Sequence, residues 1–216
     1  MKKKVALFGA TGGLGIELQK FLREKYDVIC LSSKDVDVTQ FKDVNDFFSA
    51  NKPEIVVNLA GVNYDSFVHK IDENNIVHLH NIVNVNILGS VNITSCALKQ
   101  MRAANYGRII LISSILSKKV VMGTAVYSAS KAFIDNLVKT ASAENCAKGI
   151  TCNSLQLGYF DGGMCHRLPP AAQEAIKNMI PSRRWGKIEE LASTIDYLIN
   201  TEYVTGQNID VSGGLI

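Results

Sequence analysis

The sequence of 216 residues has no long apolar run and no long run of one charge. No stretch approaches the roughly 20 apolar residues that a membrane helix requires. The formal net charge is +3, and there is no extended basic segment beyond Lys2-Lys3-Lys4. The apolar stretch Val5-Ala6-Leu7-Phe8 is too short for the hydrophobic region of a signal peptide. These absences argue against a membrane protein and against a protein that binds nucleic acid.

The sequence also has no linker rich in Pro, Gly or Ser, no low-complexity tract and no internal repeat, so we expect one domain over residues 1–216. Its five cysteines include no C-x-x-C pair. An odd, scattered set of cysteines is typical of reduced, cytoplasmic proteins, so we expect a cytoplasmic protein without a metal site. The content of 47% hydrophobic and 20% charged residues is ordinary for one globular core.

A strand, a glycine-rich turn and a helix are predicted at the start of the chain. Val5 to Phe8 form an apolar strand, and Gly9-Ala10-Thr11-Gly12-Gly13-Leu14-Gly15 precedes a helical pattern that continues to Arg23. Glycines allow the backbone to approach a pyrophosphate closely, and the N-terminus of a helix supplies N–H groups to it. The glycine spacing is G-x-x-x-G-x-G, so the turn alone is a weak signal for a dinucleotide.

The second predicted strand, Tyr26 to Leu31, ends at Ser32, Ser33 and Lys34. A carboxylate at this place would bind the ribose of NAD, whereas a cation or hydroxyl suits the 2′-phosphate of NADP. Lys34 with Ser32 and Ser33 therefore favours NADP, although the nearby Asp35 leaves NAD open. A plain polar turn is the alternative interpretation.

Strands and helices alternate along the rest of the chain, which predicts a doubly wound parallel sheet. The segment after the second strand is short: Asp37-Val38-Thr39 follows almost at once, and a helical stretch covers Phe41 to Ala50. A crossover between parallel strands normally takes a dozen or more residues. We therefore expect a mostly seven-stranded sheet with a very short third strand, and a helix after strand two that is shortened or missing.

The strongest chemical signal is the pair Tyr127 and Lys131. The spacing of four residues places both on one face of a helix that starts there. Ser114 ends a strand of β-branched residues, at the edge where ligands bind in open α/β sheets. An ammonium near a phenol favours the phenolate and lowers the pKa of the tyrosine, which suits a proton donor. An exposed tyrosine and lysine at a helix start is the alternative.

These motifs together resemble the short-chain dehydrogenase/reductase family over nearly the whole chain. The resemblance is carried by Gly9-x-x-x-Gly13-x-Gly15, Asp37-Val38, Asn58-x-Ala60-Gly61, Asn86, Ser114, Tyr127-x-x-x-Lys131 and the closing Thr205-Gly206-Gln207 with Gly213-Gly214. The pattern is most similar to 3-oxoacyl-[acyl-carrier-protein] reductases. It implies a single α/β Rossmann-like domain that uses NADP, or NAD, to interconvert a carbonyl and a secondary alcohol.

The resemblance also implies roles for single residues. Tyr127 is the general acid/base, Lys131 lowers its pKa and binds the ribose, and Ser114 orients the carbonyl. Asn86 holds a water in a proton relay to Lys131, an expectation that comes from the family alone. The expected cofactor-binding residues are Gly9, Thr11, Gly12, Gly13, Leu14, Gly15, Ser32, Ser33, Lys34, Asp37, Val38, Asn58, Ala60, Gly61, Tyr127, Lys131 and Gly158.

Three positions depart from the family pattern. Phe8 replaces the threonine that often precedes the first glycine. Leu157 and Gly162 replace the proline before Gly158 and the threonine that holds the nicotinamide carboxamide. Asp161 or a backbone N–H are the candidates to replace that threonine. The shortened link after the second strand weakens the assignment to acyl-carrier substrates.

Two functions from different classes remain open. The first is an NADP-dependent reductase of a small carbonyl substrate, in a homodimer or homotetramer as the family implies. The second is a dinucleotide-binding sensor or scaffold without turnover, which the missing carboxamide threonine supports. We expect a mostly apolar substrate pocket built from Ile115, Val120, Met122, Tyr159 and a flap over 161–181, in which His166 and Arg167 are candidates to meet an anionic substrate.

Overall fold

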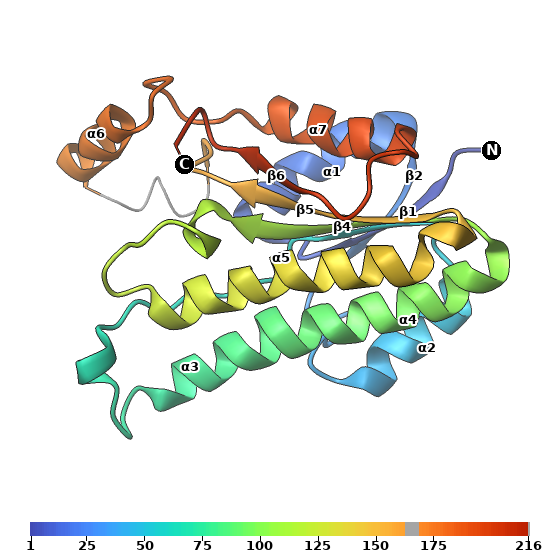
Figure 1. The fold of residues 1–216 in the computed structure, drawn as a ribbon, viewed down its shortest axis with the longest axis horizontal. Helices are drawn as coiled ribbons and strands as arrows, with labels where there is room; N and C mark the ends of the chain where they lie inside the picture. Colours follow the sequence, from blue (N-terminus) through green and yellow to red (C-terminus); the bar gives the residue numbers. More distant parts are fainter. Residues whose placement is uncertain (163–168, 216) are drawn as a thin grey trace.

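Six parallel strands form the centre of the molecule (Figure 1). The computed structural model describes residues 1–162 and 169–215. The strands lie in the order β2-β1-β3-β4-β5-β6 and all pair in parallel. Their bounds are β1 Lys4–Phe8, β2 Asp27–Leu31, β3 Ile55–Asn58, β4 Gly107–Ser114, β5 Ile150–Leu157 and β6 Asn208–Val211. Every strand therefore ends at the same edge of the sheet.

Helices cover both faces of the sheet, so the expected doubly wound α/β fold is confirmed (Figure 1). Helices α1 (Gly13–Lys25) and α7 (Ile188–Asn200) lie on one face. Helices α2 (Phe41–Asn51), α4 (Gly89–Ala104) and α5 (Ala125–Asn145) lie on the other. Because both faces are covered, β3, β4 and β5 are buried along their whole length. Helix α6 (Pro170–Met179) lies past the carboxyl edge.

The sheet has six strands in the described residues rather than the expected seven. The expected third strand at 37–39 is a turn, in which the Asp37 carboxylate accepts hydrogen bonds from the N–H (2.9 Å) and hydroxyl (2.8 Å) of Thr39. Val36 and Val38 instead point into the core beneath α2 and α4. The link from β2 to α2 is too short to add a paired strand, so its apolar side chains fill the core.

A continuous helical segment runs from Ile76 to Ala104. It consists of α3 (Ile76–Ile82), a π-helical segment η2 (Val83–Leu88) and α4. A Cβ at Gly89 would lie 2.8 Å from Val38 Cγ2, so the glycine lets the β2–α2 link pack against the helix. π-helical segments are frequent at functional sites, and this one carries Asn86.

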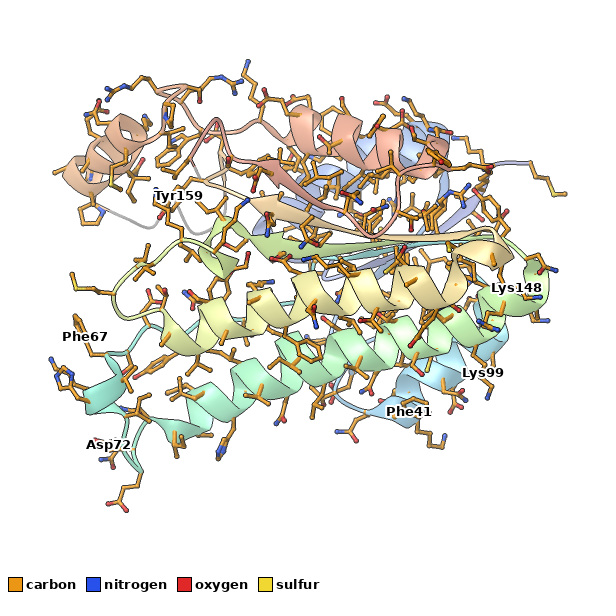
Figure 2. All side chains as sticks on the ribbon, viewed as in Figure 1. Phe41, Phe67, Asp72, Lys99, Lys148 and Tyr159 are labelled. Carbon is orange, nitrogen blue, oxygen red and sulfur yellow. The ribbon has the colours of Figure 1, made fainter. Side chains whose placement is uncertain are left out.

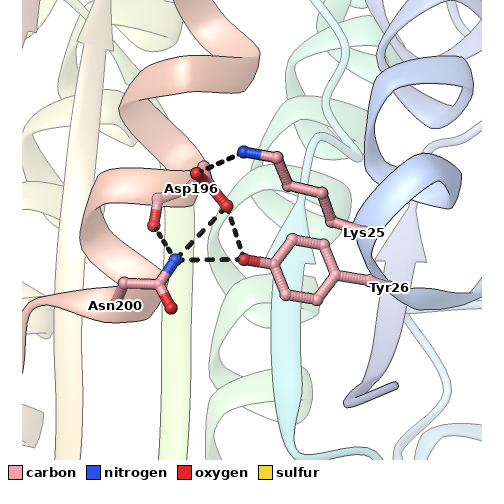
Figure 3. Close-up of polar contacts among 4 residues, drawn as sticks. All are labelled: Lys25, Tyr26, Asp196 and Asn200. Atoms are coloured by element: carbon pink, nitrogen blue, oxygen red, sulfur yellow. Dashed lines mark hydrogen bonds and ion pairs between the residues drawn. The ribbon is translucent and has the colours of Figure 1, made fainter. Parts of the chain in front are cut away.

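A polar cluster connects the junction of α1 and β2 to α7, on the face of the sheet opposite α5, which we call the far face (Figure 3). The Tyr26 hydroxyl donates to Asp196 (2.6 Å), and Lys25 forms an ion pair with the same carboxylate (2.7 Å). The Asn200 amide donates to the Tyr26 hydroxyl at 3.2 Å. Burial, followed by the bond to Asp196, raises the pKa of Tyr26 to about 12. We name this group, Lys25, Tyr26, Asp196 and Asn200, the far-face cluster.

No helix in residues 1–162 and 169–215 combines the length and the hydrophobicity needed to cross a bilayer. The same residues contain no group of three or more His, Cys, Asp or Glu side chains that could hold a metal ion. Cys30, Cys96, Cys146 and Cys152 have free thiols.

Candidate active site

The predicted site residues meet at the carboxyl edge of the sheet. The loops that follow β1, β2 and β3 and the last residue of β4 all lie there. Figure 2 places Tyr159 and Phe67 at this edge and Lys99 and Lys148 at the opposite one. Open α/β sheets bind ligands where their strands end.

The turn from β1 to α1 has the shape of an anion-binding site. The N–H of Gly12 donates to the carbonyl of Gly9 (3.1 Å), which tightens the turn. Gly9 has φ +75°, and a Cβ there would lie 2.7 Å from the backbone nitrogen of Ala60. Thr11, Gly12 and Gly13 are exposed, and no side chain caps the N-terminus of α1. The first N–H groups of α1 can therefore bind a phosphate.

The turn after β2 holds Asp35 and exposes Lys34. The Asp35 carboxylate accepts hydrogen bonds from the N–H (2.8 Å) and hydroxyl (2.6 Å) of Ser32. These bonds lower the pKa of Asp35. Ser33 and Lys34 are exposed beside them. The Asp35 carboxylate is occupied by hydrogen bonds within the turn. Ser33 and Lys34 are therefore the residues able to contact a 2′-phosphate.

The segments 37–38 and 58–61, which are expected to contact the adenine and the middle of the cofactor, are fixed by hydrogen bonds. The Val38 carbonyl accepts from Asn92 (2.9 Å), which fixes the 37–38 turn on α4. The Asn58 side chain accepts from the Ala60 N–H (3.0 Å) and donates to Ser90 (3.4 Å). Gly61 follows, and it lies open at the surface. The structure thus brings Asp37, Val38, Asn58, Ala60 and Gly61 to the edge, and their cofactor contacts stay predictions.

Tyr127, Lys131 and Ser114 come together at the start of α5. The Ser114 hydroxyl lies near enough to the Tyr127 phenol to lower its pKa. The Ser114 oxygen also accepts from the Leu116 N–H (3.1 Å). Lys131 is buried and donates to the carbonyl of Ile112 (2.8 Å), and its Nζ lies 5.6 Å from the centre of the Tyr127 ring. The helix start places phenol and ammonium on one face, as the spacing predicts.

Asn86 lies beside this group as the family pattern implies, and its expected role in a water relay stays a prediction. Its side chain donates to the Val62 carbonyl (3.0 Å) and accepts from the Val62 N–H (2.9 Å). It also donates to the Ser130 hydroxyl (3.0 Å). A Cβ at Gly61 would lie 3.5 Å from both Asn86 Oδ1 and Lys131 Nζ, which shows how closely these groups gather. Asn86 therefore connects the loop after β3 to α5.

Burial dominates the pKa of the phenol. Burial raises the pKa of Tyr127, while the nearby Ser114 hydroxyl lowers it and the charge of Asp65 raises it. Burial lowers the pKa of Lys131 from 10.5 to about 8. The expectation that Lys131 lowers the pKa of Tyr127 stays a prediction.

The sequence reasoning missed Ser130 and Asp65. Ser130 donates to the Tyr127 carbonyl (2.7 Å) and accepts from Asn86. Its position inside the Tyr-x-x-x-Lys motif was the available signal. Asp65 lies in the loop after β3 near enough to affect the phenol, and its distance from Tyr127 depends on a loop conformation that no residue pattern specifies.

The departure at Leu157 and the family glycine at Gly158 have packing explanations. Leu157 extends β5 and is buried in the core beneath α7, where a proline would lack the N–H that strands use. Gly158 donates to the Val211 carbonyl (3.0 Å), and a Cβ there would lie 2.8 Å from Ser212 Cα. Gly162 has φ +107°, and a Cβ added there would meet nothing within 4 Å. The predicted cofactor contact of Gly158 stays a prediction.

A groove of about 570 Å³ opens beside the start of α5. It is lined by the loop over 116–125, by 67–69 and by Ser128, Ala129 and Ala132. The expected pocket residues divide: Val120 and Met122 line this groove, whereas Ile115 and Tyr159 pack with Trp185 and Ile180. His166 and Arg167 lie outside the described residues.

Comparisons with known proteins agree with this geometry. A family model described as enoyl-(acyl carrier protein) reductase matches residues 17–216. Nodulation protein G of Azospirillum brasilense is 29% identical and aligns over all of this chain and 99% of its own length. The acetoacetyl-CoA reductase of Shinella zoogloeoides is 35% identical over 74% of this chain and 67% of its own length. The 3-oxoacyl-[acyl-carrier-protein] reductase of Pseudomonas aeruginosa is 31% identical over 76% and 66%.

Solved structures share the whole fold. A protein of Agrobacterium tumefaciens with bound NADP, assigned as a 2-deoxy-D-gluconate 3-dehydrogenase, superposes with a TM-score of 0.90 at 26% identity, over 99% of this chain and 96% of that one. ElxO with NADP bound superposes with a TM-score of 0.88 over 100% and 99%, and at 22% identity it supports the fold alone.

Proposed function

Because the chain belongs to the short-chain dehydrogenase/reductase family, we propose that it reduces a carbonyl group with NADPH and that Tyr127 supplies the proton. The chain is an NAD(P)-dependent oxidoreductase of this family. The identity of the substrate and the role of the tyrosine belong to the proposal. The observation that carries it is the cluster of Tyr127, Ser114 and Lys131 beside an uncapped glycine turn.

The residues of the chain fit a dinucleotide. The exposed N-terminus of α1 suits the pyrophosphate, and the open surface at Gly61, next to Asn86 and Lys131, leaves room for the nicotinamide ribose. Ser33 and Lys34 suit a 2′-phosphate, which favours NADP over NAD. The NADP bound to a structure with 26% identity supports the same choice. When bound, the reduced nicotinamide supplies a hydride to the carbonyl carbon.

The side chains divide the remaining work. The Ser114 oxygen accepts from Leu116, so its hydrogen is available for the substrate oxygen. Tyr127 then donates its phenolic proton to the same oxygen as negative charge develops there. With a pKa of about 8, Lys131 is mostly protonated near neutral pH, so its charge stabilises the phenolate that remains.

We propose a 3-oxoacyl thioester as the substrate class. The acetoacetyl-CoA and 3-oxoacyl-carrier reductases among the relatives support this choice. The groove beside α5 is lined by apolar Phe67, Val121 and Met122 and by Lys119, a composition that suits a chain with an anionic end. The shortened β2–α2 link leaves the choice of carrier open.

The alternative, a dinucleotide-binding sensor or scaffold without turnover, has one supporting feature. Gly162 offers no side chain to hold the carboxamide. Against it, Tyr127, Lys131, Ser114 and Asn86 are all gathered at one place, and the relatives from Pseudomonas aeruginosa and Shinella zoogloeoides are named as reductases. We therefore favour the enzyme.

The assembly is proposed to be a homodimer or homotetramer formed through the long helices. Val77, Val83 and Leu88 are large apolar side chains exposed on the segment from α3 to α4. Light scattering after size-exclusion chromatography tests this proposal, and a monomer at micromolar concentration contradicts it. A cytoplasmic location is proposed because four free thiols fit a reducing compartment.

Two measurements test the proposed function. Saturating NADPH should raise the melting temperature by linkage, and NADH should raise it less. A panel with a 3-oxoacyl thioester, a simple ketone, an aldehyde and a sugar-derived ketone is then followed by the loss of NADPH absorbance. The account expects the thioester to be reduced fastest. If neither cofactor changes the melting temperature, the proposal fails.

A further inference from the structure

Helix α5 carries a second buried charge on the face that holds the proposed catalytic pair. Tyr127, Lys131 and Asp135 follow one another at steps of four residues, so they share one side of the helix. Lys131 and Asp135 are only 5% and 7% exposed. Buried charges are rare unless they are paired or hydrogen-bonded, so the carboxylate needs an explanation.

Asp135 is held by strand β5 rather than by a cation. Its Oδ1 accepts from the Ser154 hydroxyl (2.9 Å), and its Oδ2 accepts from the Gln156 amide (2.5 Å). Both partners are buried. Two donors aimed at two carboxylate oxygens suit the ionised form of the group.

The same amide reaches the loop that follows Ser114. Gln156 lies opposite Ser113 in the β4–β5 register, and its Nε2 also donates to the Ser117 hydroxyl (2.9 Å). The network from Asp135 through Gln156 to Ser117 therefore joins the helix of Tyr127 to the segment that positions Ser114. A displacement of Asp135 would affect both sides of the site.

The buried ammonium of Lys131 has no carboxylate within ion-pair distance in the part of the chain that the structure describes. Its hydrogen bond goes to the neutral carbonyl of Ile112. Burial disfavours the charged form, and the charge of Asp135 acts against burial. A carboxylate one turn away on the same buried helix face acts on the ammonium through surroundings that screen charge less than water does.

Other ionisable groups do not take this role among the described residues. The Tyr127 ring lies 5.6 Å from Nζ, and Cys152 on β5 is a neutral thiol because burial raises its pKa to about 12. The remaining ionisable groups on α5 and on the elements packed against it are Lys139, Glu144, Cys146, Lys148, His78, His80, Cys96, Lys99, Arg102 and Arg108. Asp135 alone contributes an electrostatic interaction to the shift of Lys131.

We propose that Asp135 is a positioning residue of this site, which keeps Lys131 charged and fixes α5 against β5 through Ser154 and Gln156. The inference rests on the proposed function, because a charged Lys131 matters only where Tyr127 donates a proton. Its physical core, the coupling between the two buried charges, stands independently of turnover.

The test compares Asp135→Asn with Ser154→Ala in the full chain. Carbon-13-labelled lysine and an Lys131→Arg reference variant allow the titration midpoint of Lys131 to be followed by NMR without cofactor or substrate. Asp135→Asn removes the charge and should lower the midpoint by about one to two pH units. Ser154→Ala removes a hydrogen bond and keeps the charge, so its midpoint should stay near that of the wild type. If Asp135→Asn does not fold, Asp135→Ser is the second neutral variant, and Asp135→Glu should restore the midpoint.

The pH profile of turnover gives a second readout that a merely structural role would not change. The loss of kcat at high pH should move to lower pH in Asp135→Asn, by the same amount as the NMR midpoint, and stay in place in Ser154→Ala. An unchanged Lys131 midpoint in a folded Asp135→Asn overturns the proposal. A shifted midpoint in a chain that reduces no carbonyl would instead overturn the proposed function and leave the coupling of the two charges intact.

Discussion

Tyr26 and Tyr127 each have a lysine close by, and they differ in which group lies at the phenolic hydroxyl. Tyr26 donates to Asp196, and the charge of Lys25 is used on the same carboxylate (Figure 3). The Tyr127 phenol lies near the Ser114 hydroxyl, and Lys131 has no carboxylate at ion-pair distance within residues 1–162 and 169–215.

Burial raises the pKa of both phenols, so burial alone does not separate them. The carboxylate on Tyr26 raises the pKa further and binds the proton in place. The Ser114 hydroxyl near Tyr127 lowers the pKa of that phenol instead. A Tyr–Lys pair therefore becomes suited to proton transfer when the nearest acidic group bonds to neither member.

Replacing Lys131 and Lys25 should give the largest difference between the two Tyr–Lys pairs. Lys131→Met removes the charge that stabilises a phenolate, so we expect kcat to fall by about a thousandfold, within the range of general acid–base catalysis. Lys25→Met should leave kcat unchanged, because that ion pair is exposed and is worth at most about 1 kcal/mol. Steady-state kinetics and urea unfolding of both variants check this. Equal turnover in the two variants would remove the distinction.

The two neighbouring serines at the end of β4 allow a second comparison between a site residue and a matched control. Ser114→Ala removes the hydroxyl that meets Tyr127 and the substrate oxygen, so kcat should fall by about 30- to 100-fold. Ser113→Ala is the matched control, since its hydroxyl donates to the carbonyl of Lys131 (3.1 Å). It should cost about 1 kcal/mol of stability with little change in kcat. A larger kinetic effect at Ser113 than at Ser114 contradicts the assignment.

Lys34 is outside both Tyr–Lys pairs and is proposed to contact the cofactor. Its replacement should therefore change cofactor binding. Lys34→Ala should weaken NADPH binding by about tenfold, the equivalent of one charge-assisted hydrogen bond, and leave NADH binding unchanged. Fluorescence titration with each cofactor measures this. A parallel loss for NADH would mean that Lys34 supports the turn instead of the 2′-phosphate.

The smallest effect is expected at Tyr26. Its folded pKa of about 12 exceeds the ordinary value of 10.0, so the folded chain retains a proton that the unfolded chain releases. The stability from this bond is present below pH 10 and decreases as the pH rises toward 12. Tyr26→Phe should reduce the fall in unfolding free energy across that window. Urea unfolding at several alkaline pH values detects it, and an identical fall in both proteins would place the shift elsewhere.

Local patterns predicted the parts of the fold that depend on local physics. The strand–turn–helix over 5–23 and the helix that starts at Tyr127 need only spacing, glycine positions and apolar periodicity. The site at the edge follows, because parallel strands all end there.

Three features could not be predicted from the sequence. The segment at 37–39 has strand-like residues, and only the absence of a pairing partner and the burial of Val38 against Gly89 make it a turn. The network around Asp135 depends on side chains that meet across β5 and α5, which lie far apart in the chain. The raised pKa of Tyr127 likewise results from burial, a property of the packed molecule.

The most direct test of the central claim compares Tyr127→Phe with Tyr26→Phe, with kcat and the dissociation constant of NADPH measured on the same preparations. The account predicts that Tyr127→Phe binds NADPH as the wild type does and loses turnover, while Tyr26→Phe keeps both. Full turnover in Tyr127→Phe would contradict it.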